Sequence, residues 1–293
     1  MPDSDGDVRI RRTHVWPTCF DLQMAVNAVA TTGIYCQPGC VARPDPRNVA
    51  EFAVPAAAEA AGYRACHRCR PYRDDEPPGV IGPGLVCRAV QMVCDGALDE
   101  GSEAELAADV GVSARHLRRL FTEYIGVTPD ALARSRRAHF ARRLLDETDL
   151  SVSEVAFASG YGSVRQLQRA CADTFGESPS ALRARRRSTD LLDADSGLRL
   201  RLWHASTYDW GRRLRELDFR TTGDTDSGRA AAVDGNTYRY RVDSDAGEGT
   251  VELRAGGPDH LEMHADLRTW DALVHTVRAA RRIAGLDETP VAA

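Results

Sequence analysis

The chain has 293 residues, of which 43% are hydrophobic and 28% are charged. This composition is typical of a folded protein with two or three domains, and it excludes a disordered or fibrous chain. No apolar run approaches the roughly 18 residues of a membrane helix, and the first residues lack the pattern of a secretory signal. We therefore expect a cytoplasmic protein with no membrane partner.

The net charge of -5 by itself argues against a nucleic-acid partner. The charge is, however, distributed unevenly between segments of the chain. Residues 189–293 hold 14 arginines against 19 acidic residues, whereas residues 113–187 hold 14 arginines against 8. An excess of arginine in one stretch is typical of a surface that binds DNA phosphates. Double-stranded DNA is therefore the expected partner of the middle of the chain.

Four of the eight cysteines form two close pairs near the N-terminus, in TTGIYCQPGC and ACHRC. The spacings C-x3-C and C-x2-C are typical of a Zn2+ site in which each pair forms a turn. The expected ligands are Cys36, Cys40, Cys66 and Cys69. Nearby apolar residues predict a small core that, together with zinc, folds a domain over residues 1–72. These apolar residues are Ile34, Tyr35, Val49, Phe52 and Tyr63.

A zinc site of this kind can be structural or reactive. A free cysteine has a pKa of about 8.5, and bound zinc deprotonates it outright. Four thiolates around one divalent cation leave a formal charge of about -2, so one sulfur keeps enough electron density to attack a carbon electrophile. The resulting thioether has lost one negative charge and should bind a polyanionic backbone more tightly. The spacing of the cysteines leaves both possibilities open.

Residues 73–84 are rich in proline, glycine and acidic side chains, and they predict a linker. From Val86 onward, apolar residues recur with helical spacing and predict a helix that ends near Gly101. An internal repeat follows, because residues 105–132 align with residues 154–182 at an offset of 49 before the turn and 50 after it. Each copy has a short helix, a glycine turn and an arginine-bearing helix, which is the pattern of a helix-turn-helix motif.

The apolar positions of each copy, Phe157 among them, are expected to pack the motif, and the positions between them to face DNA. The side chains expected to reach bases and phosphates are Ser113, Arg115, His116, Arg118, Arg119, Ser163, Arg165, Gln166, Gln168 and Arg169. Residues 129–145 predict a long connecting helix with its arginines mostly on one side. Two linked recognition helices can enter successive major grooves, about 34 Å apart.

After an acidic linker at residues 189–197, the pattern becomes alternating. Strands are predicted at 198–203, 238–242, 250–255 and 260–267, and helices at 208–219 and 270–286. An antiparallel sheet with helices on one face is the economical assembly. The expected fold class is therefore multidomain. It comprises a small α/β domain with a four-cysteine zinc site, an all-α double helix-turn-helix domain at 85–188, and an α+β domain at 198–288.

The motifs TTGIYC and GYRACHRCRP closely resemble the zinc domain of the Ada family, which responds to DNA methylation, over about residues 19–71. The resemblance implies that Cys36 is both a zinc ligand and the acceptor of a methyl group from a DNA methylphosphotriester. The other three cysteines would remain ligands. It also implies DNA contacts by Thr32, Arg43 and Arg64. The implied enzyme is a single-turnover cysteine methyltransferase.

Residues 86–187, with LSVSEVAFASGYGSVRQLQRACADTFGESPSALR, closely resemble the AraC-type DNA-binding domain. The two resemblances together imply a transcriptional regulator of the response to DNA alkylation. Its binding to promoters would increase on methylation, and RNA polymerase would be a partner.

The last segment resembles the small N-terminal domain of 3-methyladenine DNA glycosylases of the AlkA type. The chain stops at Ala293, so no glycosylase catalyst is expected in it, and a separate glycosylase domain would be a partner. Two alternatives remain open. One is an AraC-type regulator with purely structural zinc, since Ala30, Gln37 and Val41 stand where relatives usually carry arginine. The other is the non-catalytic part of a split glycosylase.

Overall fold

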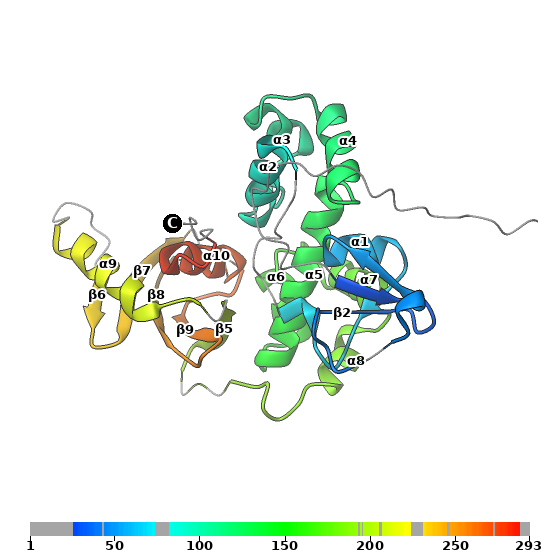
Figure 1. Cartoon of the computed structure of the whole chain (residues 1–293). Coiled ribbons are helices and arrows are strands. Elements are labelled where there is room, and N and C mark those ends of the chain that lie inside the picture. The colour runs from blue at the N-terminus through cyan, green and yellow to red at the C-terminus, as the bar shows by residue number, and fades with distance from the viewer. Residues whose placement is uncertain are drawn as a thin grey trace, which may run out of the picture.

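The computed structural model of the chain describes residues 26–42, 44–73, 82–192, 194, 196–204, 207–223, 231–244, 247–271 and 273–287. Its elements form three regions around one long helix, α5 (Pro129–Glu147). Figure 1 shows α5 in the middle, with a small N-terminal region in blue on one side and a C-terminal sheet region, yellow to red, on the other. This arrangement confirms a multidomain fold. No helix in the described ranges is long and apolar enough to cross a membrane.

The N-terminal region is a four-stranded sheet with the order β3-β1-β2-β4. β1 pairs antiparallel with β2 and β3, and β2 pairs parallel with β4. Gly33 turns the chain between β1 and β2 with a φ of 64°, a left-handed conformation that favours glycine. The elements are β1 (Val26–Val29), β2 (Ile34–Cys36), η1 (Pro46–Asn48), β3 (Val49–Phe52), α1 (Pro55–Ala60), β4 (Arg64–Ala65) and η2 (Pro71–Arg73).

The expected small core of this region is not separate, which corrects the sequence prediction. Tyr35 on β2 is fully buried and belongs to one apolar cluster with Leu144 of α5 and Phe175 of the second helix-turn-helix unit. Ala56 and Ala57 of α1 belong to a second cluster, which includes Phe121 of the first unit. Strands of two to four residues offer little apolar area, so the region gains burial by packing on the helices.

The helical region confirms the internal repeat. Helices α3 and α6 begin 49 residues apart, and α4 and α7 begin 50 apart. Ser102 with Glu105 and Ser151 with Glu154 form equivalent capping boxes at the first helix of each unit, so the same local signal starts both copies. The helices are α2 (Gly84–Cys94), α3 (Glu103–Asp109), α4 (Ala114–Tyr124), α5, α6 (Val152–Ala158), α7 (Val164–Phe175) and α8 (Pro179–Ala184).

Three details of this region differ from the sequence predictions. Helix α2 ends at Cys94 rather than near Gly101, because Gly96 turns the chain with a φ of 96°. Phe157, expected in the core, is 41% exposed on α6. The arginines of α5 do not share one side, because Arg134 is exposed whereas Arg142 and Arg143 are fully buried between regions. Helix α5 is therefore a central element of the whole protein rather than a solvated connector.

The C-terminal region is a five-stranded antiparallel sheet with the order β5-β9-β8-β7-β6. The predicted strands are confirmed, and β6 is an additional edge strand. Buried side chains such as Leu200, Leu253 and Met263 point from the sheet toward the helices, as expected for helices on one face. The elements are β5 (Leu198–Trp203), α9 (Trp210–Gly223), β6 (Ala231–Asp234), β7 (Thr237–Ser244), β8 (Gly247–Ala255), β9 (His260–Asp266) and α10 (Leu273–Ala284).

Side chains of α5 hold the edge of this sheet. The backbone N–H of Arg201 on β5 donates a 2.9 Å hydrogen bond to Oε2 of Glu147, and the carbonyl of Arg201 accepts one from Arg143. Two side chains one turn apart on a helix thus replace a neighbouring strand at that residue. The edge strand therefore has hydrogen-bonding partners in α5 as well as in β9.

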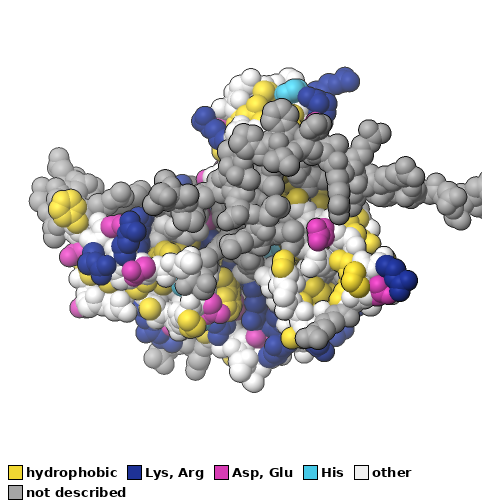
Figure 2. Space-filling model, viewed as in Figure 1, with side chains coloured by type: hydrophobic (Ala, Val, Ile, Leu, Met, Phe, Trp, Pro, Cys, Tyr) yellow, Lys and Arg dark blue, Asp and Glu magenta, His cyan; other side chains and the backbone are white. Residues whose placement is uncertain are grey.

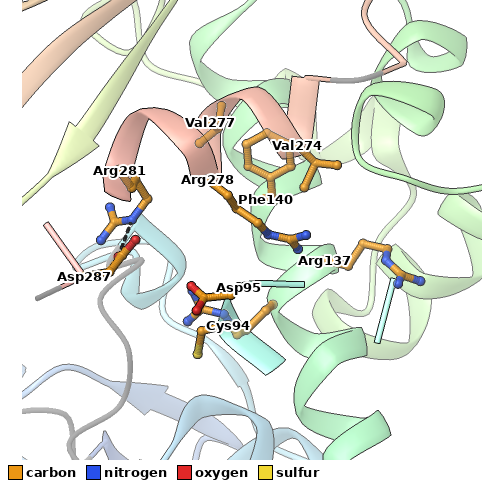
Figure 3. Close-up of a pocket in the computed structure, with 10 residues that line it drawn as sticks. Cys94, Asp95, Arg137, Phe140, Val274, Val277, Arg278, Arg281 and Asp287 are labelled. Atoms are coloured by element: carbon orange, nitrogen blue, oxygen red, sulfur yellow. Dashed lines mark hydrogen bonds and ion pairs between the residues drawn. The ribbon is translucent and has the colours of Figure 1, made fainter. Parts of the chain in front are cut away.

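A second contact joins the helical region to α10. Asp99 accepts hydrogen bonds from Arg137 of α5, at 3.1 Å, and from Arg278 of α10. Figure 3 shows the adjacent pocket between α2, α5 and α10, which Asp95 and Arg278 both line. Its volume is about 40 Å³. That space holds little more than a water molecule, so the pocket is a packing detail of the interface rather than a ligand site.

Candidate zinc site and nucleic-acid interface

The four predicted cysteines meet in one cluster. Their sulfur atoms all lie within 4.8 Å of one another, although the two pairs are far apart in sequence. Pairing of β2 with β4 brings the pairs together, because the N–H of Cys66 donates a 2.9 Å hydrogen bond to the carbonyl of Tyr35. Gly39, with a φ of 79°, turns the chain back so that Cys40 faces Cys36. The clustering predicted from the spacing is confirmed.

The chemistry of the cluster fits a zinc ion. Burial and the neighbouring thiols raise the pKa of Cys36 above its usual range, and burial raises the pKa of Cys69 to about 12. Thiols whose pKa is raised in this way do not ionise at neutral pH by themselves, so a cation must supply the compensating charge. A tetrahedral set of four cysteine ligands is a common arrangement for Zn2+. The cluster is therefore a zinc site.

Backbone hydrogen bonds distinguish the sulfurs. The N–H of Arg68 donates to Sγ of Cys66 at 3.4 Å, and the backbone of Gln37 donates to Cys69. A thiolate that accepts N–H bonds shares its electron density with those donors, so these bonds reduce the nucleophilic character of Cys66 and Cys69.

Two of the three expected DNA contacts of this region lie together. Thr32 is exposed in the turn before β2, with its hydroxyl 3.3 Å from the carbonyl of Val29. Arg64 is exposed on β4, and its N–H bonds the carbonyl of Gly33 beside that turn. Arg43 lies outside the described residues. The exposed Arg68, between two ligands, is a further basic side chain that the sequence prediction did not include.

The predicted recognition residues lie on the outer faces of α4 and α7. Ser113 and Ser163 are helix N-caps, and each side chain accepts a hydrogen bond from the backbone N–H three residues later. Gln166 also acts locally, because its side-chain oxygen accepts from the N–H of Gly162 at 2.9 Å. The residues exposed or half-exposed on these faces are Arg115, His116, Arg118, Arg119, Arg165, Gln166, Gln168 and Arg169.

The two recognition helices differ in how their arginines are paired. On α4, Arg118 forms an ion pair with Glu103 of α3, and Arg119 pairs with Glu123 at 3.3 Å. Within the described ranges, Arg165 and Arg169 of α7 have no acidic partner. Figure 2 shows basic side chains and a histidine gathered at the end of the molecule formed by α3 and α4. Both motifs thus present basic side chains, and the described structure gives acidic partners to those of α4 but not to Arg165 and Arg169 of α7.

A thiolate zinc site packed on two helix-turn-helix units defines a class of zinc-containing DNA-binding proteins. Comparison with known families makes the assignment narrower. Residues 20–72 match the family described as "Metal binding domain of Ada", and residues 106–185 match "Helix-turn-helix domain". A segment similar to the Ada metal-binding domain thus precedes a segment similar to a helix-turn-helix domain.

Three relatives are similar to this chain over half of its length or more. A protein of Mycobacterium tuberculosis named "Probable bifunctional transcriptional activator/DNA repair enzyme AlkA" is 35% identical over 91% of this chain and 53% of its own length. "Bifunctional transcriptional activator/DNA repair enzyme Ada" of Escherichia coli is 33% identical over 52% of this chain and 42% of its own. "Bifunctional transcriptional activator/DNA repair enzyme AdaA" of Bacillus subtilis is 27% identical over 61% and 85%. The chain spans about half the length of the Mycobacterium relative.

Proposed function

We propose that this protein is a transcriptional regulator of the response to DNA alkylation, which repairs methylphosphotriesters by transferring the methyl group to Cys36. The observation that carries the proposal is the four-sulfur cluster. Cys36 belongs to it, whereas backbone N–H bonds reduce the nucleophilic character of its neighbours Cys66 and Cys69. The combination of activator and repair enzyme in the names of the relatives supports the same conclusion.

The transfer is a displacement at the methyl carbon. Bound zinc supplies the positive charge that keeps the four cysteines ionised. Sγ of Cys36 donates an electron pair to the methyl carbon, the bond between that carbon and the phosphate oxygen breaks, and the oxygen leaves as the phosphodiester anion. No proton moves, so the step needs no general base. The thioether product is stable, which makes the reaction a single turnover.

The low solvent exposure of Cys36 should limit the size of the alkyl group that can be transferred to it. Cys36 is 7% exposed, while Pro38 and Gly39 at the surface beside it are open to solvent. A small methyl carbon that projects from a phosphate can reach Sγ, whereas a bulkier alkyl group would contact the surrounding backbone first. Arg64 and Arg68 are exposed near the cluster and would attract the DNA backbone.

Methylation should convert the zinc region from a sensor into a DNA-binding element. The reaction removes one negative charge from a surface that faces phosphate, which strengthens its attraction for DNA. The helix-turn-helix units would then select the promoter through α4 and α7. Activation implies RNA polymerase as a partner, and a DNA substrate implies that the protein acts in the cytoplasm.

We also propose that residues 1–72, 85–188 and 198–288 act as domains, joined by linkers at 73–84 and 189–197. The third would be a domain of the AlkA N-terminal kind, because the Mycobacterium relative of that name matches 91% of this chain. The antiparallel sheet with helices on one face supports this assignment. We assign no glycosylase catalyst to it.

Intact mass spectrometry tests the methyl transfer. Zinc-loaded protein is incubated with an oligonucleotide that carries methylphosphotriesters, and the modified residue is mapped by peptide mass. The expected result is a gain of one methyl group on Cys36 that is absent from Cys36→Ala. Cys87→Ala, which removes a half-buried thiol outside the cluster, is the matched control and should still gain the methyl.

A regulator with purely structural zinc is the second candidate. It is favoured by Val41, which is 70% exposed beside Cys40 and gives the surface an apolar side chain where a cation would bind phosphate. In that case the protein would retain zinc and bind promoter DNA but gain no methyl group. The same mass measurement therefore decides between the two candidates.

A further inference from the structure

Three buried polar side chains from two regions meet beside the zinc cluster. Glu59 on α1 accepts a 2.7 Å hydrogen bond from the hydroxyl of Tyr35, and its carboxylate lies 2.6 Å from Nε2 of His139. Tyr35 directly precedes Cys36 in β2, and His139 lies in the middle of α5. One carboxylate thus holds the strand of the acceptor cysteine against the helix that joins the two helix-turn-helix units.

The surroundings of Glu59 leave it little freedom. The side chains of Glu59 and His139 are 9% and 7% exposed, and Tyr35 is fully buried. Ser135, one turn before His139 on α5, also hydrogen-bonds the carboxylate. Burial alone would raise the pKa of Glu59, but its interactions with His139, Ser135 and Tyr35 lower it. A buried carboxylate with three donors strongly favours one arrangement of its partners.

The cluster extends to the second recognition helix. The ring of His139 lies 5.9 Å from that of Phe175, the last residue of α7, and 6.5 Å from that of Tyr72 in η2. Strand β4, which carries Arg64 and pairs with β2, also lies against α7. A continuous path of packed and hydrogen-bonded groups therefore runs from the acceptor strand to α7.

We infer that Glu59 is a positioning residue that couples methylation of Cys36 to the DNA affinity of the second recognition helix; this inference rests on the proposed function. Methylation adds a carbon to the sulfur that ends β2 and removes its charge. A small shift of β2 then moves the Tyr35 hydroxyl relative to Glu59. Because the same carboxylate bonds His139, the shift changes how α5 supports Phe175 at the end of α7.

Variants that keep side-chain shape test the coupling. Glu59→Gln removes the charge and Tyr35→Phe removes the hydroxyl, and promoter affinity is measured before methylation and after complete methylation. In both variants the increase in affinity on methylation should fall by about fivefold or more relative to the wild type. Tyr63→Phe is the matched control, since Tyr63 packs on Phe52 in the same region and should leave the increase unchanged. An unaltered increase in both variants would show that electrostatics alone carries the signal and would overturn the inference.

Hydrogen exchange separates failure of the coupling from failure of the proposed function, because it needs no methyl group. In the zinc-loaded full chain, Glu59→Gln should accelerate exchange both in β2 and in the last turn of α7, and Tyr63→Phe should accelerate neither. If the wild type gains no methyl group but Glu59→Gln still accelerates exchange in both segments, the proposed function is refuted and the coupling is retained. A response confined to β2 would overturn the coupling whether or not methyl is transferred.

Discussion

The hydroxyl of Tyr72 donates a 2.9 Å hydrogen bond to Oδ2 of Asp146, and both side chains are buried. Tyr72 belongs to the tail of the zinc region, whereas Asp146 lies in the last turn of α5. The same carboxylate lies 3.0 Å from Nη2 of Arg142 and 3.6 Å from Nη1 of Arg70. One buried acid therefore fixes the position of the zinc region on the helix that both DNA-binding units share.

Removing either partner of this contact should destabilise the protein, and removing Asp146 should cost more than removing the Tyr72 hydroxyl. Tyr72→Phe should lower the free energy of unfolding by about 1 kcal/mol, because Asp146 loses one of several donors. Asp146→Ala should lower it by about 3 to 5 kcal/mol, because Arg142 would be left buried without its carboxylate. Denaturant unfolding measures both, with Tyr63→Phe as control. Equal losses in the two variants would contradict the role given to the carboxylate.

Asp190, which bonds Arg70 and Arg73 of the N-terminal region, should make the stability of the protein sensitive to acid. Burial alone would raise its pKa, but hydrogen bonds from the Arg187 backbone and from Arg70 and Arg73 hold the pKa at about 2. A carboxyl group with a lowered folded pKa stabilises the protein above its unfolded pKa of about 4 and stops doing so as the pH falls through about 2. Wild type should exceed Asp190→Asn in stability by about 2 kcal/mol at neutral pH. That difference should shrink between about pH 4 and pH 2 in unfolding measurements, and a constant difference would refute the assignment.

Glu147 should control how firmly the C-terminal sheet is held. Glu147→Ala removes the acceptor of the Arg201 N–H and takes away the favourable charge that Glu147 places beside the buried Arg143. We expect a loss of about 3 kcal/mol and faster hydrogen exchange along β5. Glu216→Ala, at an exposed ion pair on α9, is the control and should change neither. Slow exchange in β5 of the Glu147 variant would mean that pairing with β9 alone holds the edge.

Glu103 should restrain the first recognition helix. Its carboxylate forms an ion pair with Arg118, whose guanidinium faces outward from α4. Glu103→Gln should therefore raise promoter affinity by about two- to fivefold at low salt, because Arg118 becomes free to bind phosphate. Glu216→Gln, which releases arginines far from α4, is the matched control for the change in net charge. An equal gain from both variants would mean that only the total charge matters.

Arg165 should contribute directly to DNA binding, because it is exposed at the start of α7 and no acidic side chain in the described structure pairs with it. Arg165→Ala should weaken promoter binding and reduce the slope of log affinity against log salt by about 1 if the contact is to phosphate. Binding titrations at several salt concentrations measure both quantities. Unchanged affinity and slope would remove Arg165 from the DNA interface.

Local patterns predicted the zinc site and the repeat well. The two cysteine pairs meet in one cluster, and the 49- and 50-residue offsets reappear in the starts of the helices. Such features depend on ligand spacing, helix caps and turns. Each of these involves residues close together in the chain, so it can be recognised from the sequence. Phe157 shows the limit, since an apolar residue at helical spacing predicts burial only when a neighbouring element covers it.

The amino-acid sequence by itself determined which cysteines meet in one cluster, where α4 and α7 begin and that a sheet with helices follows. Tertiary structure decided what each face of α5 contacts: Glu59 meets His139 across 80 residues, and Glu147 meets Arg201 across 54. Neither pair has a local signal, because a glutamate on the alanine-rich α1 or at the end of the arginine-rich α5 is equally compatible with solvent. Only the packing of three regions on one helix buries these charges, and burial makes their partners obligatory.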